Sequence, residues 1–159
     1  MKSLGATPQK DVGRLFQSTA KITALIRYNK KGEPGEVLEK VKLIAGLGME
    51  GNLHQGGERQ LCLLTAEIRE WMDSCAEKGL CFRRFSENML IEGLPDGVLP
   101  PSTRLQIGEA VLQVSESHKH CFTECRLVSE SIRCRLSECA VFAVVECGGT
   151  VQVGQKAWL

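Results

Sequence analysis

The segment His118-Lys119-His120-Cys121 places a thiol directly after three basic side chains. Cationic neighbours lower the pKa of a thiol and so raise the fraction that is present as thiolate. Thiolate is the form that attacks sulfur, carries a persulfide or binds a soft metal ion. Cys125 follows closely enough to act as a resolving partner. We therefore predict a functional thiol at Cys121, with Cys125 as its neighbour and the two histidines tuning its reactivity, although solvated loop histidines are the alternative.

Two further cysteines, Cys134 and Cys139, lie in the same stretch as Cys121 and Cys125. Closely spaced cysteine pairs are typical of structural zinc sites. Here the pairs Cys121/Cys125 and Cys134/Cys139 are each spaced more widely than the usual two intervening residues, and the gap between the pairs is short. A non-catalytic zinc-binding or redox-sensing module therefore stays open as an alternative, as does inert packing.

The length, charge and cysteine content of the chain limit the classes of protein to which it can belong. The chain has 159 residues and eight cysteines, but its first residues are too polar for a signal peptide, so we expect reduced thiols in a cytoplasmic protein. A formal net charge of +1 does not favour nucleic acid as a partner. No apolar run approaches the roughly 20 residues that span a membrane. We expect four cysteines to be small hydrophobic packing residues: Cys62, Cys75, Cys81 and Cys147.

Two other segments carry polar side chains within apolar or glycine-rich surroundings. The glycine-rich run 46–57 leads to Arg59. A glycine-rich turn with a guanidinium group can hold an anion through backbone N–H groups and bidentate hydrogen bonds, although a plain loop is the alternative. The pair Glu87-Asn88 interrupts a short apolar strand, which indicates side chains that face a cleft, or else an edge strand with one wet face.

Hydrophobic periodicity predicts the elements that position these residues. One apolar stripe at helical spacing predicts a helix that begins after Thr65 and stops at Gly79. The glycines of 46–57 argue against a regular element there, and 121–135 is expected to be a loop with short helical turns. The expected strands are 21–27, 37–44, 61–64, 85–91, a hairpin over 103–115, 140–145, and short strands around 151–153 and after Gln155. This pattern predicts a mainly β barrel with a few peripheral helices.

Several motifs, taken in order, resemble the MOSC family, the domain named for the C-terminal part of molybdenum cofactor sulfurases. The resemblance covers residues 20–159, with an N-terminal arm over 1–19, and is strongest to short stand-alone bacterial members in which a second cysteine follows the main one. It is carried by Gly48-Met49-Glu50-Gly51-Asn52-Leu53-His54, Arg59-Gln60, Phe85-Ser86-Glu87-Asn88-Met89-Leu90, Leu105-Gln106-Ile107-Gly108-Glu109-Ala110, Cys121, Val145-Glu146-Cys147-Gly148-Gly149-Thr150-Val151 and Val153-Gly154-Gln155.

The resemblance implies a MOSC-type β-barrel in which Cys121 is the family's key cysteine. In larger relatives that cysteine carries sulfur as a persulfide or ligates molybdenum in the bound molybdenum cofactor (molybdopterin). The implied activity is sulfur transfer or a molybdenum-cofactor-dependent reaction. The chain has no room for the pyridoxal-phosphate desulfurase domain of full sulfurases, so sulfur must arrive from a partner such as a cysteine desulfurase. The implied cofactor-binding positions are His54, Arg59, Gln60, Glu87 and Asn88.

The chain departs from the family pattern at two positions. Asn52 and Gln155 stand where family members commonly have aspartate. The first change removes a negative charge from the glycine-rich loop.

A third interpretation of the function also remains open, in which a MOSC barrel serves as a transferase or reductase for unrelated small molecules, because a fold does not fix a function.

Overall fold

The computed structural model describes residues 20–75, 79, 81–82, 85–94, 99–117 and 121–159. These ranges are mainly β, with short helices, as the sequence predicts. The strands are β1 (Lys21–Arg27), β2 (Glu36–Leu38), β3 (Lys40–Ile44), β4 (Gly48–Met49), β5 (Leu61–Thr65), β6 (Met89–Glu92), β7 (Arg104–Ile107), β8 (Ala110–Ser117), β9 (Val141–Cys147) and β10 (Gly149–Gln152), and the helices are α2 (Ala66–Ser74), α3 (Arg126–Ser129) and α4 (Arg135–Cys139).

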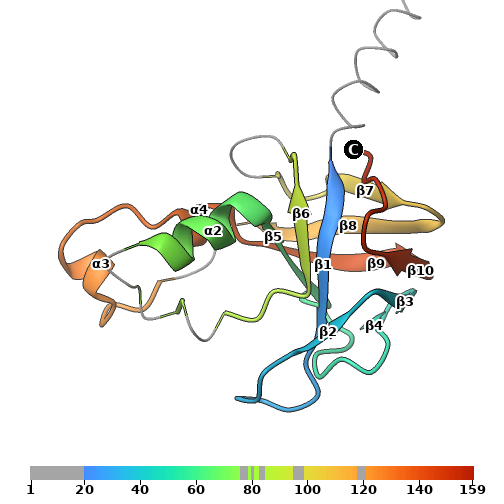
Figure 1. The fold of residues 1–159 in the computed structure, drawn as a ribbon, viewed down its shortest axis with the longest axis horizontal. Coiled ribbons are helices and arrows are strands. Elements are labelled where there is room, and N and C mark those ends of the chain that lie inside the picture. The colour runs from blue at the N-terminus through green and yellow to red at the C-terminus, as the bar shows by residue number, and fades with distance from the viewer. Residues whose placement is uncertain (1–19, 76–78, 80, 83–84, 95–98, 118–120) are drawn as a thin grey trace, which may run out of the picture.

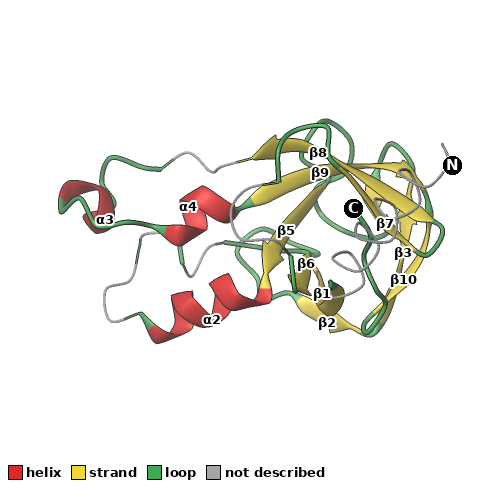
Figure 2. Ribbon diagram, turned by 90° about the horizontal axis from the view of Figure 1, so that it is seen from above, coloured by secondary structure: helices red, strands yellow, loops and turns green. Residues whose placement is uncertain are grey.

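Two sheets build a barrel-like body. Seven strands form the larger sheet in the order β2-β1-β6-β5-β9-β8-β7, and the smaller sheet has the order β10-β3-β4. The segment after β10 connects β7, at one edge of the larger sheet, with β1, the second strand from the other edge, because Lys156 pairs with Lys21 on β1 and Trp158 pairs with Gln106 on β7. Strands therefore gather at one end of the molecule and helices at the other (Figures 1 and 2). This curled sheet is the barrel-like arrangement that the sequence predicts.

The predicted strand 37–44 is not one strand. It divides at Glu39 into β2, which pairs with β1, and β3, which pairs with β10 in the other sheet. The backbone carbonyl of Glu39 accepts a hydrogen bond from Val153 N at 2.8 Å. A strand that passes from one sheet to another at a corner keeps the alternation of a single strand, so periodicity alone does not show the break.

The glycine-rich run also differs from its prediction, because it contains the short strand β4. Met49 is fully buried and pairs with Leu43 on β3. Gly48 has a φ of +119°, and a Cβ at this position would lie 3.0 Å from the backbone oxygen of Gln60. Glycine therefore allows a close approach of two backbones here rather than preventing regular pairing.

The predicted helix forms, although it is shorter than expected. The Thr65 hydroxyl accepts a hydrogen bond from Ile68 N at 3.3 Å, which caps the first turn of α2 as predicted. The helix ends at Ser74, before the predicted stop at Gly79, because Cys75 has an extended backbone conformation. Two other predicted strands are also reduced: 85–91 is a strand only from Met89, and the segment after Gln155 makes isolated bridges.

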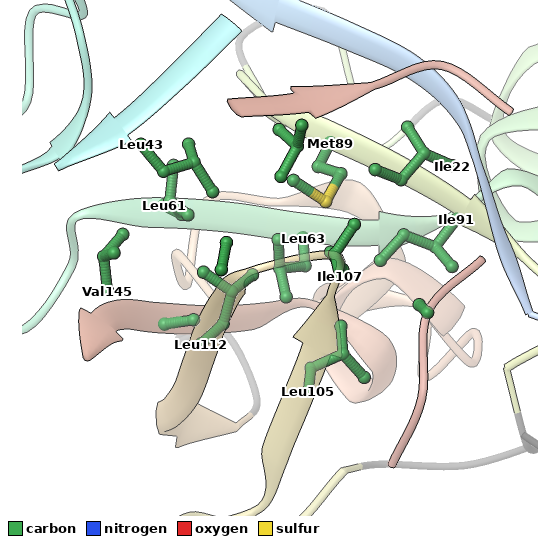
Figure 3. Packing of buried hydrophobic residues seen from close by; sticks show 14 of the residues in the cluster. Ile22, Leu43, Leu61, Leu63, Met89, Ile91, Leu105, Ile107, Leu112 and Val145 are labelled. Carbon is green, nitrogen blue, oxygen red and sulfur yellow. The ribbon is translucent and has the colours of Figure 1, made fainter. Parts of the chain in front are cut away.

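Aliphatic side chains from both sheets fill the interior of the barrel (Figure 3). Leu61 and Leu63 of β5 point into this core, whereas Leu64 packs against the helices on the other face of the sheet. β5 is thus buried on both faces, which explains its continuous apolar run. Burying one such side chain stabilises the fold by roughly 1.5–3 kcal/mol.

A second cluster forms what we call the helical lobe, made of α2, the described residues of 79–82 and the segment 121–139. Trp71 and Phe82 meet edge to face, with ring centroids 5.5 Å apart. The lobe lies to one side of the barrel (Figure 1). Its buried members are Leu64, Ile68, Met72, Phe82, Cys125, Leu127, Leu136 and Ala140. None of the helices in the described ranges has the length and apolar character that a membrane crossing requires.

Candidate functional site: a pocket lined by thiols

Cys121 is exposed at the start of the segment that leads from the end of β8 into the helical lobe. All eight cysteines are reduced in the structure. His118, Lys119 and His120 lie outside the described residues, so their effect on Cys121 stays a prediction. The residue is exposed, and exposure is one of the conditions that distinguish reactive cysteines from inert buried ones.

Cys121 lies on the rim of a pocket in the helical lobe, which we call the thiol pocket. Its volume is about 260 Å³ when the part open to solvent is included. Three chain segments meet there: the residues after α2, the turn before α3, and the start of α4. The lining residues are Gly79, Cys81, Phe82, Cys121, Phe122, Cys125, Cys134, Leu136 and Ser137. The Ser137 hydroxyl is the one polar side-chain group among these residues apart from the thiols, and it donates to the Cys134 carbonyl at 2.9 Å. The surface that the pocket presents to a ligand is therefore made mainly of sulfur and carbon atoms.

The four thiols of the pocket differ in exposure. Cys121 is exposed, Cys81 and Cys134 are half-buried, and Cys125 is only 6% exposed. The backbone N–H of Cys125 bonds to the Phe122 carbonyl at 3.0 Å, which folds residues 122–125 into a tight turn. The pocket therefore presents an outer thiol to solvent and holds an inner one close by in the same segment.

Sequence reasoning identified part of this pocket. It singled out Cys121, Cys125 and Cys134, which the structure brings together. Cys139 does not line the thiol pocket and packs beside Val141 at another small hollow. Cys81 was expected to be a packing residue; it packs against the buried cluster of the helical lobe and also lines the pocket. Cys147, for which burial was expected, is exposed. The position of Cys81 depends on how α2 packs on α4, which no local pattern reveals.

The four-cysteine zinc alternative finds no preformed site in the described ranges. Among those residues, no group of three or more histidine, cysteine, aspartate or glutamate side chains is arranged to hold a metal ion. The positions of Cys121, Cys125 and Cys134 around one pocket, with Cys139 elsewhere, agree with that finding.

The predicted cofactor-binding amide Asn88 is buried and bonded to the protein itself. Its Oδ1 accepts from Cys62 N at 3.0 Å, and its Nδ2 donates to Ile26 O at 3.1 Å and to Asn52 Oδ1 at 3.2 Å. Asn52 Oδ1 also accepts from Tyr28 N at 3.0 Å. These bonds connect β1, the glycine-rich loop and β5, so the two amides hold these three segments together.

The amide at position 52 also shows what the departure from aspartate changes. Asn52 Nδ2 donates to the backbone carbonyl of His54 at 3.3 Å, which a carboxylate could not do. A second amide, Gln60, is equally committed: its Oε1 accepts from Val145 N at 2.9 Å and its Nε2 donates to Gly57 O at 3.0 Å. Buried polar groups that are bonded in this way stabilise the fold, so these amides use their polar atoms within the protein.

Glu87 forms a bidentate ion pair with Arg69 of α2, in which Arg69 Nε donates to Oε1 at 3.1 Å and Nη2 donates to Oε2. The Tyr28 hydroxyl donates to the Glu87 backbone carbonyl at 3.0 Å. Burial, and then the negative charge of Glu87, raise the pKa of Tyr28 to about 12. Burial also strongly raises the pKa of the Cys62 thiol, which separates this inert cysteine from the exposed Cys121.

Arg59 is one of the two predicted cofactor-binding residues with an exposed side chain, and His54 is the other. Arg59 Nε donates to Glu116 Oε2 at 2.5 Å and Nη2 donates to Oε1 at 3.2 Å. Its guanidinium also lies 4.5 Å from the centroid of the Phe142 ring. Glu116 is near the end of β8, so Arg59 is fixed at the base of the segment that leads to Cys121.

A wider hollow, the hairpin cleft, opens between the β1–β2 connection and the helical lobe. Its volume is about 1270 Å³, again including open solvent. Phe82 lines both this cleft and the thiol pocket, so the two hollows adjoin. The cleft is lined by Tyr28, Lys31, Gly32, Glu33, Pro34, Gly35, Arg69, Phe82 and Phe85.

Comparison with known proteins agrees with this architecture. The YuaD protein from Bacillus subtilis is 19% identical, with a TM-score of 0.65 over 87% of this chain and 93% of that chain. YiiM from Escherichia coli is 20% identical, with a TM-score of 0.59 over 87% of this chain and 69% of that chain. YiiM from Geobacillus stearothermophilus is 14% identical, with a TM-score of 0.53 over 90% of this chain and 74% of that chain. At these identities the likeness shows the fold alone.

A search of curated proteins returned no match to the sequence. The family comparison is more informative, because the model of the MOSC domain matches residues 50–157. This range contains both the glycine-rich loop from Gly51 onward and the thiol pocket. The chain therefore belongs to the MOSC domain family.

Proposed function

We propose that this MOSC protein is a sulfur carrier that serves the molybdenum cofactor, with Cys121 as the carrying residue. The observation that supports the proposal is the setting of Cys121: an exposed thiol on the rim of an apolar pocket, within a fold whose family is named for cofactor sulfuration. Cys62, by contrast, is buried and has a strongly raised pKa, so it does not suit this role.

The chemistry needs three sulfur atoms in line: the attacking thiolate, the sulfur that is transferred and the sulfur that leaves. The Cys121 thiolate attacks the outer sulfur of a persulfide on a donor protein, the sulfur–sulfur bond of the donor breaks, and the donor leaves as a thiolate. The product is a persulfide on Cys121. A cysteine desulfurase is the donor class we expect, because such an enzyme generates a persulfide on its own cysteine. No oxidant or reductant is consumed.

The residues present fit the cofactor in part. Cys121 offers the soft sulfur ligand that suits the metal, and Arg59 offers a guanidinium that suits a phosphate through bidentate bonds. To do so Arg59 must exchange its bond to Glu116. When bound, the cofactor supplies the redox chemistry of molybdenum. The buried amides and Glu87 do not fit as direct contacts, because their polar atoms are already bonded within the protein.

The decisive experiment measures sulfur on individual cysteines. The protein is incubated with cysteine and a pyridoxal-phosphate-dependent cysteine desulfurase, alkylated, digested and analysed by mass spectrometry. We expect the Cys121 peptide to gain one sulfur atom, and Cys121→Ser to abolish the gain. Cys147→Ser is the matched control, because Cys147 is exposed but lies at the end of β9. Equal sulfur uptake by Cys121→Ser and the native chain would overturn the proposal.

The cofactor part is tested separately, by measuring pterin and molybdenum in protein made in a host that synthesises the cofactor. We expect both to copurify with the native chain and to fall in Cys121→Ala. Equal pterin content in the two proteins would remove Cys121 from the cofactor site while leaving sulfur carriage to stand on the first experiment.

A further inference from the structure

The thiol pocket contains more sulfur than a single carrier needs. Three cysteines besides Cys121 line it, and they come from three different places along the chain. These cysteines also pack in the cluster of the helical lobe, whereas the larger barrel cluster is filled by aliphatic residues and methionine. The thiols are also ordered by exposure, from the exposed Cys121 to Cys125, which is 6% exposed.

A persulfide on Cys121 alone would be exposed to the same solution that delivers its sulfur. Small thiols attack persulfides and release the sulfur as hydrosulfide, and the rate depends on access to the sulfur atoms. The pocket beside Cys121 is walled by carbon and sulfur, including Phe82, Phe122 and Leu136. Sulfur held further inside would be shielded from water and from small thiols.

We propose that Cys121 and Cys125 form a two-step sulfur relay, in which Cys121 receives sulfur and Cys125 stores it inside the pocket. This inference rests on the proposed sulfur-carrying function. Cys125 is the acceptor because it is the least exposed thiol of the pocket and because the turn at residues 122–125 places it in the lining of the same pocket as Cys121. Cys81 and Cys134 complete the soft wall around the stored sulfur.

The transfer is balanced without any other reactant. Cys125 loses its proton, and its thiolate attacks the outer sulfur of the Cys121 persulfide. The bond between the outer sulfur and Cys121 Sγ breaks, and Cys121 leaves as a thiolate that takes up a proton. One sulfur–sulfur bond forms as another breaks, so the sulfur moves inward without oxidation or reduction.

The test is a time course on the full chain, loaded with cysteine and a cysteine desulfurase and then freed of the donor. Mass spectrometry locates the extra sulfur on each cysteine peptide, before and after treatment with glutathione. We expect the label to appear first on Cys121 and then on Cys125, and the fraction on Cys125 to resist glutathione. Cys125→Ser should load only at Cys121 and lose the glutathione-resistant fraction, whereas Cys75→Ser, a half-buried thiol of the same lobe outside the pocket, should behave like the native chain.

The outcomes separate the two proposals. Label on Cys121 that never reaches Cys125 in the native chain would overturn the relay and leave the carrier function intact. A disulfide between the two cysteines with release of hydrosulfide would also overturn the relay, because it means that Cys125 attacks the inner sulfur. Absence of label from both cysteines would overturn the carrier function itself. Because the native chain gives the answer, the test does not depend on whether Cys125→Ser folds.

Discussion

The barrel and the helical lobe bury side chains of different chemistry. The barrel cluster is built from valine, leucine, isoleucine, alanine and methionine, whereas the lobe buries Cys125 and half-buries Cys75, Cys81, Cys134 and Cys139. The barrel cluster is also the larger of the two among the described residues. The difference teaches that most of the buried apolar surface lies in the barrel, whereas the proposed sulfur site lies in a part with fewer buried contacts, where local opening costs less free energy.

The largest expected effect comes from one matched pair of core truncations. Leu63 in the barrel and Leu136 in the lobe are each 1% exposed. We expect Leu63→Ala to lower the free energy of unfolding by about 2–5 kcal/mol, as buried leucine truncations do. Leu136→Ala should cost less, because the small lobe can collapse around the cavity, and it should speed alkylation of Cys125. Urea unfolding measures the free energy of unfolding. Equal losses in the two variants would contradict the view that the barrel contributes more to stability than the helical lobe.

The ion pair between Arg69 and Glu87 connects the lobe to the barrel. Removing Arg69 leaves a buried carboxylate without its partner, which costs up to about 3–5 kcal/mol in fully buried pairs. The Arg69 side chain is 21% exposed, so we expect the loss of unfolding free energy in Arg69→Met to lie at the lower end of this range. Adding Glu87→Gln should recover part of the loss in urea unfolding. A double variant that is no more stable than Arg69→Met would show that the pair does not set the cost.

Tyr28, which bonds to the backbone carbonyl of Glu87, makes the stability of the fold depend on pH. Its pKa is raised from 10.0 to about 12 by burial and then by Glu87, so the unfolded chain ionises first as the pH rises. Between about pH 10 and 12 the unfolded state therefore binds fewer protons, and stability falls with increasing pH. Tyr28→Phe should remove this component and cost about 0.5–1.5 kcal/mol near neutral pH for one hydrogen bond. Phenolate absorbance of the folded protein that rises at pH 10 would contradict the assignment.

The smallest effect on stability is expected at Arg59. Its side chain is 53% exposed, and exposed ion pairs contribute about 0.2–1 kcal/mol. Arg59→Ala should therefore unfold at nearly the native urea concentration, while the pterin content of protein from a cofactor-producing host falls. Glu116→Ala is the control, since it removes the same ion pair but leaves the guanidinium. Equal pterin loss in both variants would assign the effect to the ion pair rather than to Arg59.

Local patterns predicted most of the barrel. The hairpin of β7 and β8, the buried strand β9 and the cap at Thr65 depend on neighbours in sequence, and the structure confirms them. The corner at Glu39 was not predictable, because a strand keeps its alternation when it changes partner sheets.

The candidate site was harder to predict than the barrel. The sequence indicated Cys121 through its basic neighbours, but Cys81 joins the pocket only through tertiary packing. Motif positions such as Gln60 and Asn88 were expected to bind a cofactor, although in the structure both crosslink backbone segments. A polar residue in an apolar stretch therefore signals burial with a partner, and the sequence does not say whether that partner is a ligand or the backbone.

The segment that completes the larger sheet has a consequence for the order of events during synthesis. Ile22 N donates to Gln155 O at 2.9 Å, and Ala157 N donates to Ala20 O at 2.9 Å. These bonds at the start of β1 can form only after residues near the C-terminus have been synthesised. Contacts this distant in sequence slow folding and leave a strand edge unpaired in the meantime. Until residues 154–158 have been synthesised, the start of β1 therefore lacks the backbone partners that this segment supplies, although β2 and β6 can already pair with it.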